Sequence, residues 1–121
     1  MKEIKFRAWL KEKEMLVDVL GISFEEKYVR LPIESEPSDE YWWYETAWGF
    51  DEVELMQFTG LKDKNGVEIY EYSELDGAYE VIFKDLKYSL RYISNNDIID
   101  LYDYWRDKNG EIEVTREYTK V

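Results

Sequence analysis

Carboxylates are the only groups in this sequence numerous enough to suggest acid–base or metal chemistry, since 28 of its 121 residues are Asp or Glu. Two carboxylates can flank a glycosidic bond as acid and base, and three can hold a hard divalent cation. In so acidic a chain, pairs of this kind arise by coincidence, and most carboxylates form a solvated surface. The carboxylates therefore identify no candidate site by themselves.

The residue types that are missing exclude most other chemistry. The sequence has no histidine, which is the commonest general base and metal ligand, and no cysteine, so disulfides and thiolate metal sites are excluded. Its six glycines are scattered, so no glycine-rich phosphate loop is present. We therefore expect a protein that is not an enzyme, with no catalytic residue, no metal ligand, no cofactor-binding residue and no cofactor.

The most unusual stretch is the acidic and aromatic segment 34–54, which has eight carboxylates and neither Lys nor Arg. Because Trp and Tyr anchors carry much of the energy of protein interfaces, its aromatic side chains are the predicted partner-binding residues. These are Tyr41, Trp42, Trp43 and Trp48. The alternative is that they cover the core of their own chain. A further hypothesis is that the carboxylates imitate DNA phosphates and occupy a basic host protein.

The net charge of −12 limits the classes of partner. Affinity for nucleic acid rests on Lys and Arg, and anionic membranes repel acidic surfaces, so a nucleic-acid partner is disfavoured and no membrane is expected. Residues 1–9 lack the apolar core of a signal peptide, and no apolar run reaches the length of a membrane span. We expect an acidic cytoplasmic protein whose partner is another protein.

Short β-strands are the elements that must position these residues. Alternation of apolar and polar side chains predicts strands at 3–10, 53–61, 67–72 and 79–84. Asn65-Gly66 predicts a type I′ hairpin turn, which needs a positive φ at both central residues. The same tetrapeptide, Asp-Lys-Asn-Gly, recurs at 107–110 and predicts a second hairpin turn.

One helix is predicted at most, in segment 94–106. Its apolar residues share one face at helical spacing, and Ser94 or Asn96 is a candidate N-cap. The segment is short and aromatic, so a strand remains an alternative. The sequence therefore predicts a mostly β fold, organised as one domain over 1–121 or as two small β subdomains, 1–60 and 61–121.

Three blocks of the sequence resemble the YopX family of small proteins encoded by bacteriophages and prophages. They are Lys5-Phe6-Arg7-Ala8-Trp9, the long stretch from Val53 to Glu71, which includes Thr59-Gly60-Leu61-Lys62-Asp63-Lys64-Asn65-Gly66, and the strand-like block at 79–85. The chain departs from the family pattern after Glu71, and from Ile93 onward it matches only loosely. The resemblance implies an N-terminal β-sheet segment followed by a small SH3-like barrel, and a phage or prophage origin. It implies no activity.

These observations favour a non-enzymatic phage or prophage accessory protein that acts by protein–protein binding, either to itself or to a host factor. The alternative is a nucleic-acid-associated protein that uses its small β-barrel, although the net charge counts against it. A homo-oligomer is expected, because a chain of this length has little interior volume for 21 aromatic residues, five Phe, five Trp and eleven Tyr.

Overall fold

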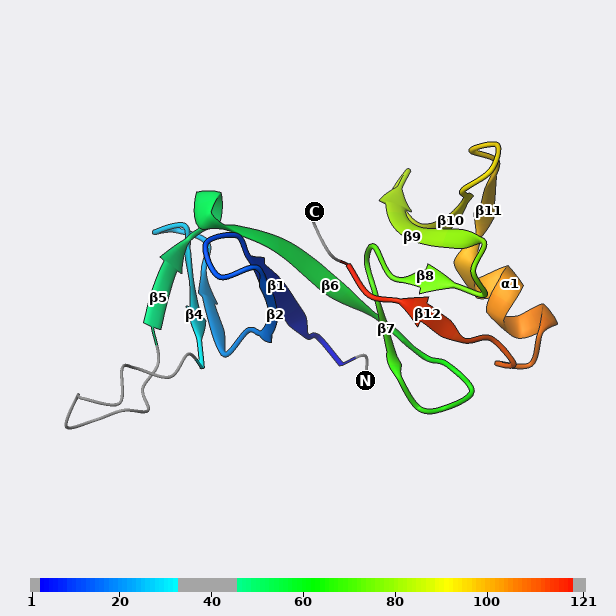
Figure 1. Cartoon of the computed structure of the whole chain (residues 1–121), viewed down its shortest axis with the longest axis horizontal. Coiled ribbons are helices and arrows are strands. Elements are labelled where there is room, and N and C mark those ends of the chain that lie inside the picture. Colours follow the sequence, from blue (N-terminus) through cyan, green and yellow to red (C-terminus); the bar gives the residue numbers. More distant parts are fainter. Residues whose placement is uncertain (1–2, 33–45, 119–121) are drawn as a thin grey trace. The chain divides into compact units, whose positions relative to one another are not determined.

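A computed structural model describes residues 3–32 and 46–118 of the chain (Figure 1). Within these ranges the fold is mostly β: twelve short strands accompany one single-turn 3-10 helix and one α-helix. The chain divides into two compact units, one holding most of residues 5–55 and the other most of residues 56–118. The boundary falls inside the longest strand, β6 (Val53–Lys62), after Leu55.

The first unit is built from two antiparallel arrangements of short strands. They comprise β1 (Phe6–Leu10) paired with β2 (Met15–Asp18), and a sheet of β3 (Gly21–Ser23), β4 (Tyr28–Leu31) and β5 (Thr46–Gly49), followed by the 3-10 helix Phe50–Glu52. Alternation along β4 places Val29 and Leu31 in the core while Arg30 is exposed. The other buried side chains of this core are those of Ala8, Leu10 and Val53.

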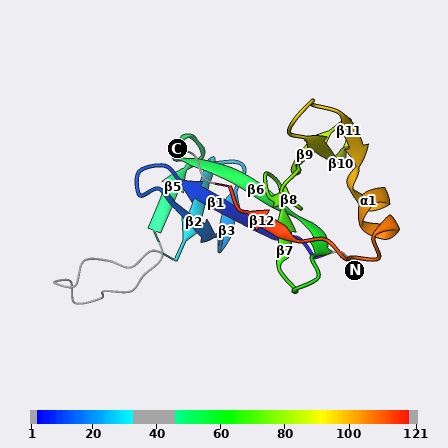
Figure 2. The same ribbon diagram turned by 45° about the vertical axis from the view of Figure 1, so that its right-hand side comes forward.

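The second unit is a curled five-stranded antiparallel sheet with the order β11-β10-β9-β8-β12 (Figures 1 and 2). Its strands are β8 (Glu74–Leu75), β9 (Tyr79–Lys84), β10 (Lys87–Tyr92), β11 (Ile98–Asp100) and β12 (Val114–Arg116). The unit also contains β7 (Glu68–Tyr70), which pairs with β6, and the helix α1 (Leu101–Asp107). The expected β-rich, barrel-like architecture is confirmed.

The core of this unit joins residues from most of its elements. It consists of Ile69, Leu75, Val81, Tyr88, Leu90, Leu101 and Ile112. In the β9–β10 ladder Val81 lies opposite Leu90, so cross-strand neighbours fill the same side of the sheet. Because Leu101 comes from α1 and Ile112 from the segment before β12, this core forms only when the C-terminal residues fold onto the sheet.

The turn between β6 and β7 closes a hairpin, as Asn65-Gly66 indicated, but its geometry differs from the prediction. Gly66 has φ +80°, whereas Asn65 is not among the residues with positive φ, so the turn is not type I′. The Gly66 N–H donates to the Asp63 carbonyl (3.1 Å) and the Asp63 N–H donates to the Val67 carbonyl (2.9 Å). This is the three-residue loop in which a left-handed glycine follows a tight turn.

Replacing Gly66 with valine should lower the free energy of unfolding by about 1–2 kcal/mol, because a β-branched residue resists positive φ. No atom lies within 4 Å of the position that a Cβ would take, so the cost comes from the backbone and not from a clash. Urea denaturation followed by tryptophan fluorescence measures the change. Gly66→Asn is the matched control and should cost less, since Asn tolerates this conformation. Equal stability of wild type and Gly66→Val would contradict the turn geometry.

Segment 94–106 is neither one helix nor one strand. Ile98–Asp100 forms β11 against β10, and α1 begins only at Leu101, with Asp100 as its N-cap. The predicted caps are therefore wrong: Ser94 and Asn96 precede β11, and Asn96 has a positive φ of 65°. Two adjacent β-branched residues, Ile98 and Ile99, favour the strand and delay the helix.

The second Asp-Lys-Asn-Gly, at 107–110, does not form a hairpin. Asp107 is the last residue of α1, and Asn109 and Gly110 both adopt positive φ to end the helix. The Gly110 N–H donates to the Trp105 carbonyl (2.9 Å), which satisfies one of the terminal helix carbonyls. The same four residues thus make two different turns, so the expected second hairpin is corrected.

Candidate functional site

Three of the four predicted partner-binding residues, Tyr41, Trp42 and Trp43, lie outside the described residues. Trp48 is described, and it lies half-buried in β5. Its ring packs against the core of the first unit, and its Nε1–H donates to Thr46 Oγ1 (2.7 Å). Trp48 therefore covers the core of its own unit, which is the alternative that the sequence left open for it.

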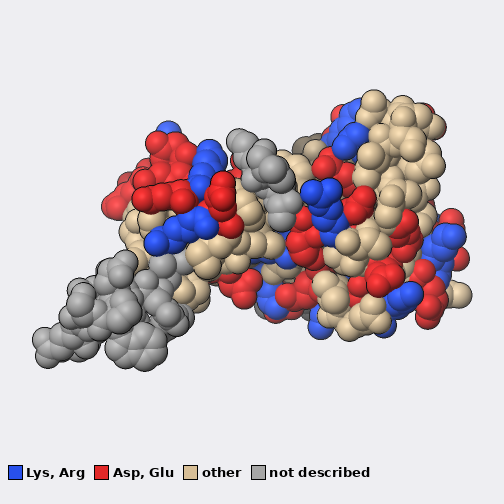
Figure 3. Space-filling view, in the orientation of Figure 1, with Lys and Arg blue, Asp and Glu red and all other residues tan. Residues whose placement is uncertain are grey.

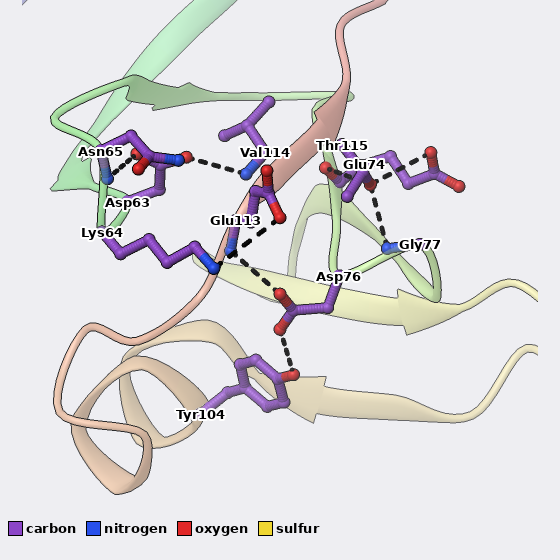
Figure 4. A network of polar contacts seen from close by, with 10 residues as sticks. All are labelled: Asp63, Lys64, Asn65, Glu74, Asp76, Gly77, Tyr104, Glu113, Val114 and Thr115. Atoms are coloured by element: carbon purple, nitrogen blue, oxygen red, sulfur yellow. Dashed lines mark hydrogen bonds and ion pairs between the residues drawn. The ribbon is translucent and has the colours of Figure 1, made fainter.

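A network of polar contacts lies where three segments of the second unit meet (Figure 4). Its centre is Asp63, which is buried and accepts three backbone hydrogen bonds. Asp63 Oδ1 accepts from the N–H groups of Asn65 (2.8 Å) and Val67 (2.9 Å), and Oδ2 accepts from Val114 N–H (2.9 Å). One carboxylate thus shapes the β6–β7 turn and also holds the first residue of β12, 51 positions along the chain.

Asp76 plays a similar part beside it, in the turn after β8. Its Oδ1 accepts from Glu113 N–H (2.9 Å), and its Oδ2 accepts from the Tyr104 hydroxyl (2.7 Å). Burial and the hydrogen bond to Asp76 raise the pKa of Tyr104 well above its ordinary value. The Gly77 N–H donates to Thr115 Oγ1 (2.9 Å), so residues 113, 114 and 115 each form one of these hydrogen bonds.

The hydrogen bonds that these carboxylates accept are structural, because most of their donors are backbone N–H groups of other segments. Burial alone raises the pKa of Asp63, but the hydrogen bonds from Val114, Val67 and Asn65 outweigh it and hold the pKa below the usual 3.8. Asp63 lies in the block that resembles the YopX family, and its carboxylate links the β6–β7 turn to β12, a link that we call the clasp. Among the described residues, no group of three Asp or Glu side chains is arranged to hold a metal ion.

Acid should remove part of the stability of the fold through this clasp. Because the folded-state pKa of Asp63 is depressed, its contribution is complete above the unfolded-state value near pH 4 and is lost as the pH falls through the folded-state pKa. The unfolding free energy, measured in urea from pH 6 to pH 3, should therefore decrease less steeply for Asp63→Asn than for wild type. Parallel curves would show that Asp63 does not contribute to the pH dependence.

A second feature is a set of exposed apolar side chains on β9, on the turn between β9 and β10, on β11 and at the start of α1. It comprises Phe83, Leu86, Ile98, Ile99 and Tyr102, which we call the β11 surface. Leu86 is 92% exposed, Phe83 is 53% exposed, and the other three are exposed by about two-fifths. Figure 3 shows an area with few charged atoms over this part of the molecule. Grouped apolar residues of this kind commonly mark protein-binding sites.

Leu86 is unusual in its backbone as well as in its exposure. Asp85 and Leu86 form the two-residue turn between β9 and β10, where Lys84 pairs with Lys87, and their φ angles are +53° and +65°. This is the type I′ geometry, for which Asn and Gly are the favoured residues. A leucine there costs about 1–2 kcal/mol of conformational energy and buries almost nothing in return. Leu86 therefore does not serve the stability of its own fold.

Three ion pairs lie near the β11 surface. Lys87 Nζ lies 3.3 Å from a carboxylate oxygen of Asp100, and Arg91 lies 3.1 Å from Glu80 on the neighbouring strand. On α1, Arg106 contacts Asp103 at 2.6 Å. Hydrogen bonds from the Asp103 N–H and from Lys87 hold the pKa of Asp100 below its ordinary value.

Sequence reasoning did not identify Leu86 as a functional residue. The available signal was a leucine at a position where a two-residue hairpin demands Asn or Gly. In the described part of the chain, no helix has the length and apolarity needed to cross a membrane.

Comparison with known proteins supports the assignment of the fold. The family model described as YopX protein matches residues 5–117, so the resemblance carried by the three blocks is confirmed. A comparison with curated proteins found no match. Among solved structures, the chain is similar to the crystal structure of protein EF1440 from Enterococcus faecalis, with a TM-score of 0.60 and 21% identity over 94% of this chain and 92% of that chain. At this identity the likeness shows the fold alone.

Proposed function

Since this chain belongs to the YopX family, we propose that it is a phage or prophage accessory protein that acts in the bacterial cytoplasm by binding protein and catalyses no reaction. The observation that carries the proposal is Leu86, a 92% exposed leucine held in a left-handed conformation in the turn between β9 and β10. Strain and exposure at the same residue are explained if Leu86 is an anchor for a partner.

The chemistry of the described residues supports the same proposal. Asp63 and Asp76, the carboxylates of the polar network, accept hydrogen bonds from backbone N–H groups and so stabilise the fold. The absence of histidine and cysteine from the sequence removes the commonest nucleophile and base pairs. Binding through the β11 surface needs none of these groups.

Leu86→Asn tests the proposal, because it should remove binding while raising the stability of the fold. Asn is favoured at this turn position, so the unfolding free energy should rise by about 0.5–1 kcal/mol. The tagged wild type and the tagged variant are each expressed in a bacterial host together with an untagged copy of the wild-type chain. Each tagged chain is then purified, and the proteins that remain bound to it, including the untagged copy, are compared. Val67→Asn is the control, since Val67 is also exposed but lies in the β6–β7 turn.

The expected result is that a protein retained by wild type and by Val67→Asn is lost with Leu86→Asn. If all three chains retain the same proteins, or if none retains any, binding through this surface is refuted. A loss of stability in Leu86→Asn would contradict the geometry of the turn from which the proposal starts.

A further inference from the structure

The tetrapeptide Asp-Lys-Asn-Gly, which occurs twice in this chain, contains a chemically reactive pair of residues. Asn65 and Asn109 are the two asparagines that a glycine follows. The backbone nitrogen of a residue can attack the side-chain amide of a preceding asparagine, and glycine hinders this approach least because it has no Cβ. The shared tetrapeptide gives both sites a similar intrinsic reactivity, so a large difference between them in the folded protein must come from structure.

The reaction needs no reagent other than water. The glycine nitrogen loses its proton and forms a bond to Cγ of the asparagine, and the side-chain amide leaves as ammonia after taking up a proton. The product is a five-membered succinimide ring, which water opens at either of its two carbonyls. One opening gives aspartate. The other gives isoaspartate, in which the main chain runs through the former side chain and is one carbon longer.

At Asn109 the structure holds the attacking nitrogen at the end of α1. The Gly110 N–H donates to the Trp105 carbonyl (2.9 Å), and the Gly110 carbonyl accepts from the N–H of Ile112 (2.8 Å), which is fully buried. The Trp105 ring lies 3.3 Å from the position that a Cβ on Gly110 would take, and its Nε1–H donates to the Lys62 carbonyl (3.1 Å). Movement of the Gly110 nitrogen toward the Asn109 side chain therefore disturbs several contacts together.

At Asn65 the same pair of residues forms the exposed tip of the β6–β7 hairpin (Figure 4). No atom lies within 4 Å of the position that a Cβ on Gly66 would take. The Gly66 N–H donates to the Asp63 carbonyl at 3.1 Å, and breaking this hydrogen bond frees the nitrogen to move. Exposed turns open locally at a small cost in free energy while the rest of the fold stays intact.

We propose that Asn65 is a site of spontaneous covalent modification in the folded protein, whereas Asn109 is protected, and that isoaspartate at position 65 releases the clasp. Asp63 Oδ1 accepts from the N–H groups of Asn65 (2.8 Å) and Val67 (2.9 Å). Isoaspartate adds one carbon to the main chain between these two N–H groups, so one oxygen no longer reaches both. Asp63 Oδ2 accepts from Val114 N–H, so displacement of the carboxylate also loosens β12.

Peptide mass spectrometry of the full chain tests where the reaction occurs. The folded protein, and the same protein unfolded in concentrated urea, are kept in mildly alkaline buffer while the conversion of each asparagine amide to a carboxylate is followed. In urea both sites should react at similar rates. In the folded protein Asn65 should react about tenfold faster than Asn109 or more, because the helix end must break more hydrogen bonds before its nitrogen can move. Equal rates in the folded protein, faster reaction at Asn109, or no reaction at Asn65 overturns the proposal.

The stability of the separated products tests the effect on the clasp. Chromatography isolates the isoaspartate form, which should unfold at a lower urea concentration than fresh wild type. Asn65→Asp is the matched control, since it has the charge of the product without the extra carbon, and it should lose less stability. Asn65→Ser keeps the backbone N–H but has no side-chain amide, so prolonged incubation should not weaken it. Unchanged stability of the isoaspartate form, an equal loss in Asn65→Asp, or a loss in incubated Asn65→Ser contradicts release of the clasp.

Discussion

Replacing Asp63 with alanine is expected to lower the free energy of unfolding by about 3 kcal/mol, because three backbone donors in part-buried hydrogen bonds lose a charged acceptor together. Two of these donors, Asn65 N–H and Val67 N–H, belong to the β6–β7 turn. The third, Val114 N–H, begins β12. The single substitution should therefore loosen the turn and the C-terminal strand at once.

Urea denaturation followed by tryptophan fluorescence and circular dichroism measures this loss. Asp63→Asn keeps one acceptor oxygen and should lose less stability than Asp63→Ala, because the amide oxygen can still accept from some of the three backbone N–H groups. Asp18→Ala is the control: Asp18 is exposed at the end of β2, and its loss should change stability by no more than about 0.5 kcal/mol. Similar losses at Asp63 and Asp18 would contradict the role of the clasp.

Replacing Leu101 with alanine should cost about 2–5 kcal/mol, the usual range for deleting a fully buried leucine side chain. Leu101 is completely buried and is the first residue of α1. It packs α1 onto the sheet, and α1 in turn presents Tyr102 and Trp105, which donate to the carbonyls of Thr59 (3.0 Å) and Lys62 (3.1 Å). Losing Leu101 should weaken these contacts as well.

The same substitution at Leu86 provides the comparison. Leu86 is 92% exposed, so Leu86→Ala should change the unfolding free energy by no more than about 0.5 kcal/mol. Thermal and urea unfolding of both variants test the contrast between a leucine that stabilises the fold and one that does not. Equal losses would mean that Leu86 is buried in solution, and would count against the exposure on which the β11 surface depends.

The strands were the most predictable part of the fold. The predicted strand 79–84 matches β9, and the predicted strand 53–61 lies within β6. A strand with one buried face alternates apolar and polar side chains, and this alternation is visible in the sequence. The segment around α1 was less predictable. Helical spacing and two β-branched residues compete there, and the pairing of Ile98–Asp100 with β10 decides between them. That pairing depends on β10, whose residues lie outside segment 94–106, so the spacing of apolar residues within the segment does not indicate it.

The candidate site was largely beyond sequence reasoning. Asp63 was recognisable as part of a turn, but its bond to Val114 crosses 51 residues and no local pattern indicates it. Leu86 belongs to no motif, and its interest comes from a φ angle and an exposed fraction that only coordinates supply. Trp48 was predicted to bind a partner because its segment has an unusual composition. In the structure it is half-buried against the core of the first unit, and its binding role stays a prediction.

The hydrogen bonds that Asp63 and Asp76 accept also determine when the second unit can finish folding during synthesis. The ribosome delivers the N-terminal residues first, so β6 and its turn emerge well before residues 112–116. Until these last residues arrive, Asp63 lacks Val114, Asp76 lacks Glu113, and the core lacks Ile112. The clasp and the core of the second unit are therefore completed only after residues 112–114 have emerged.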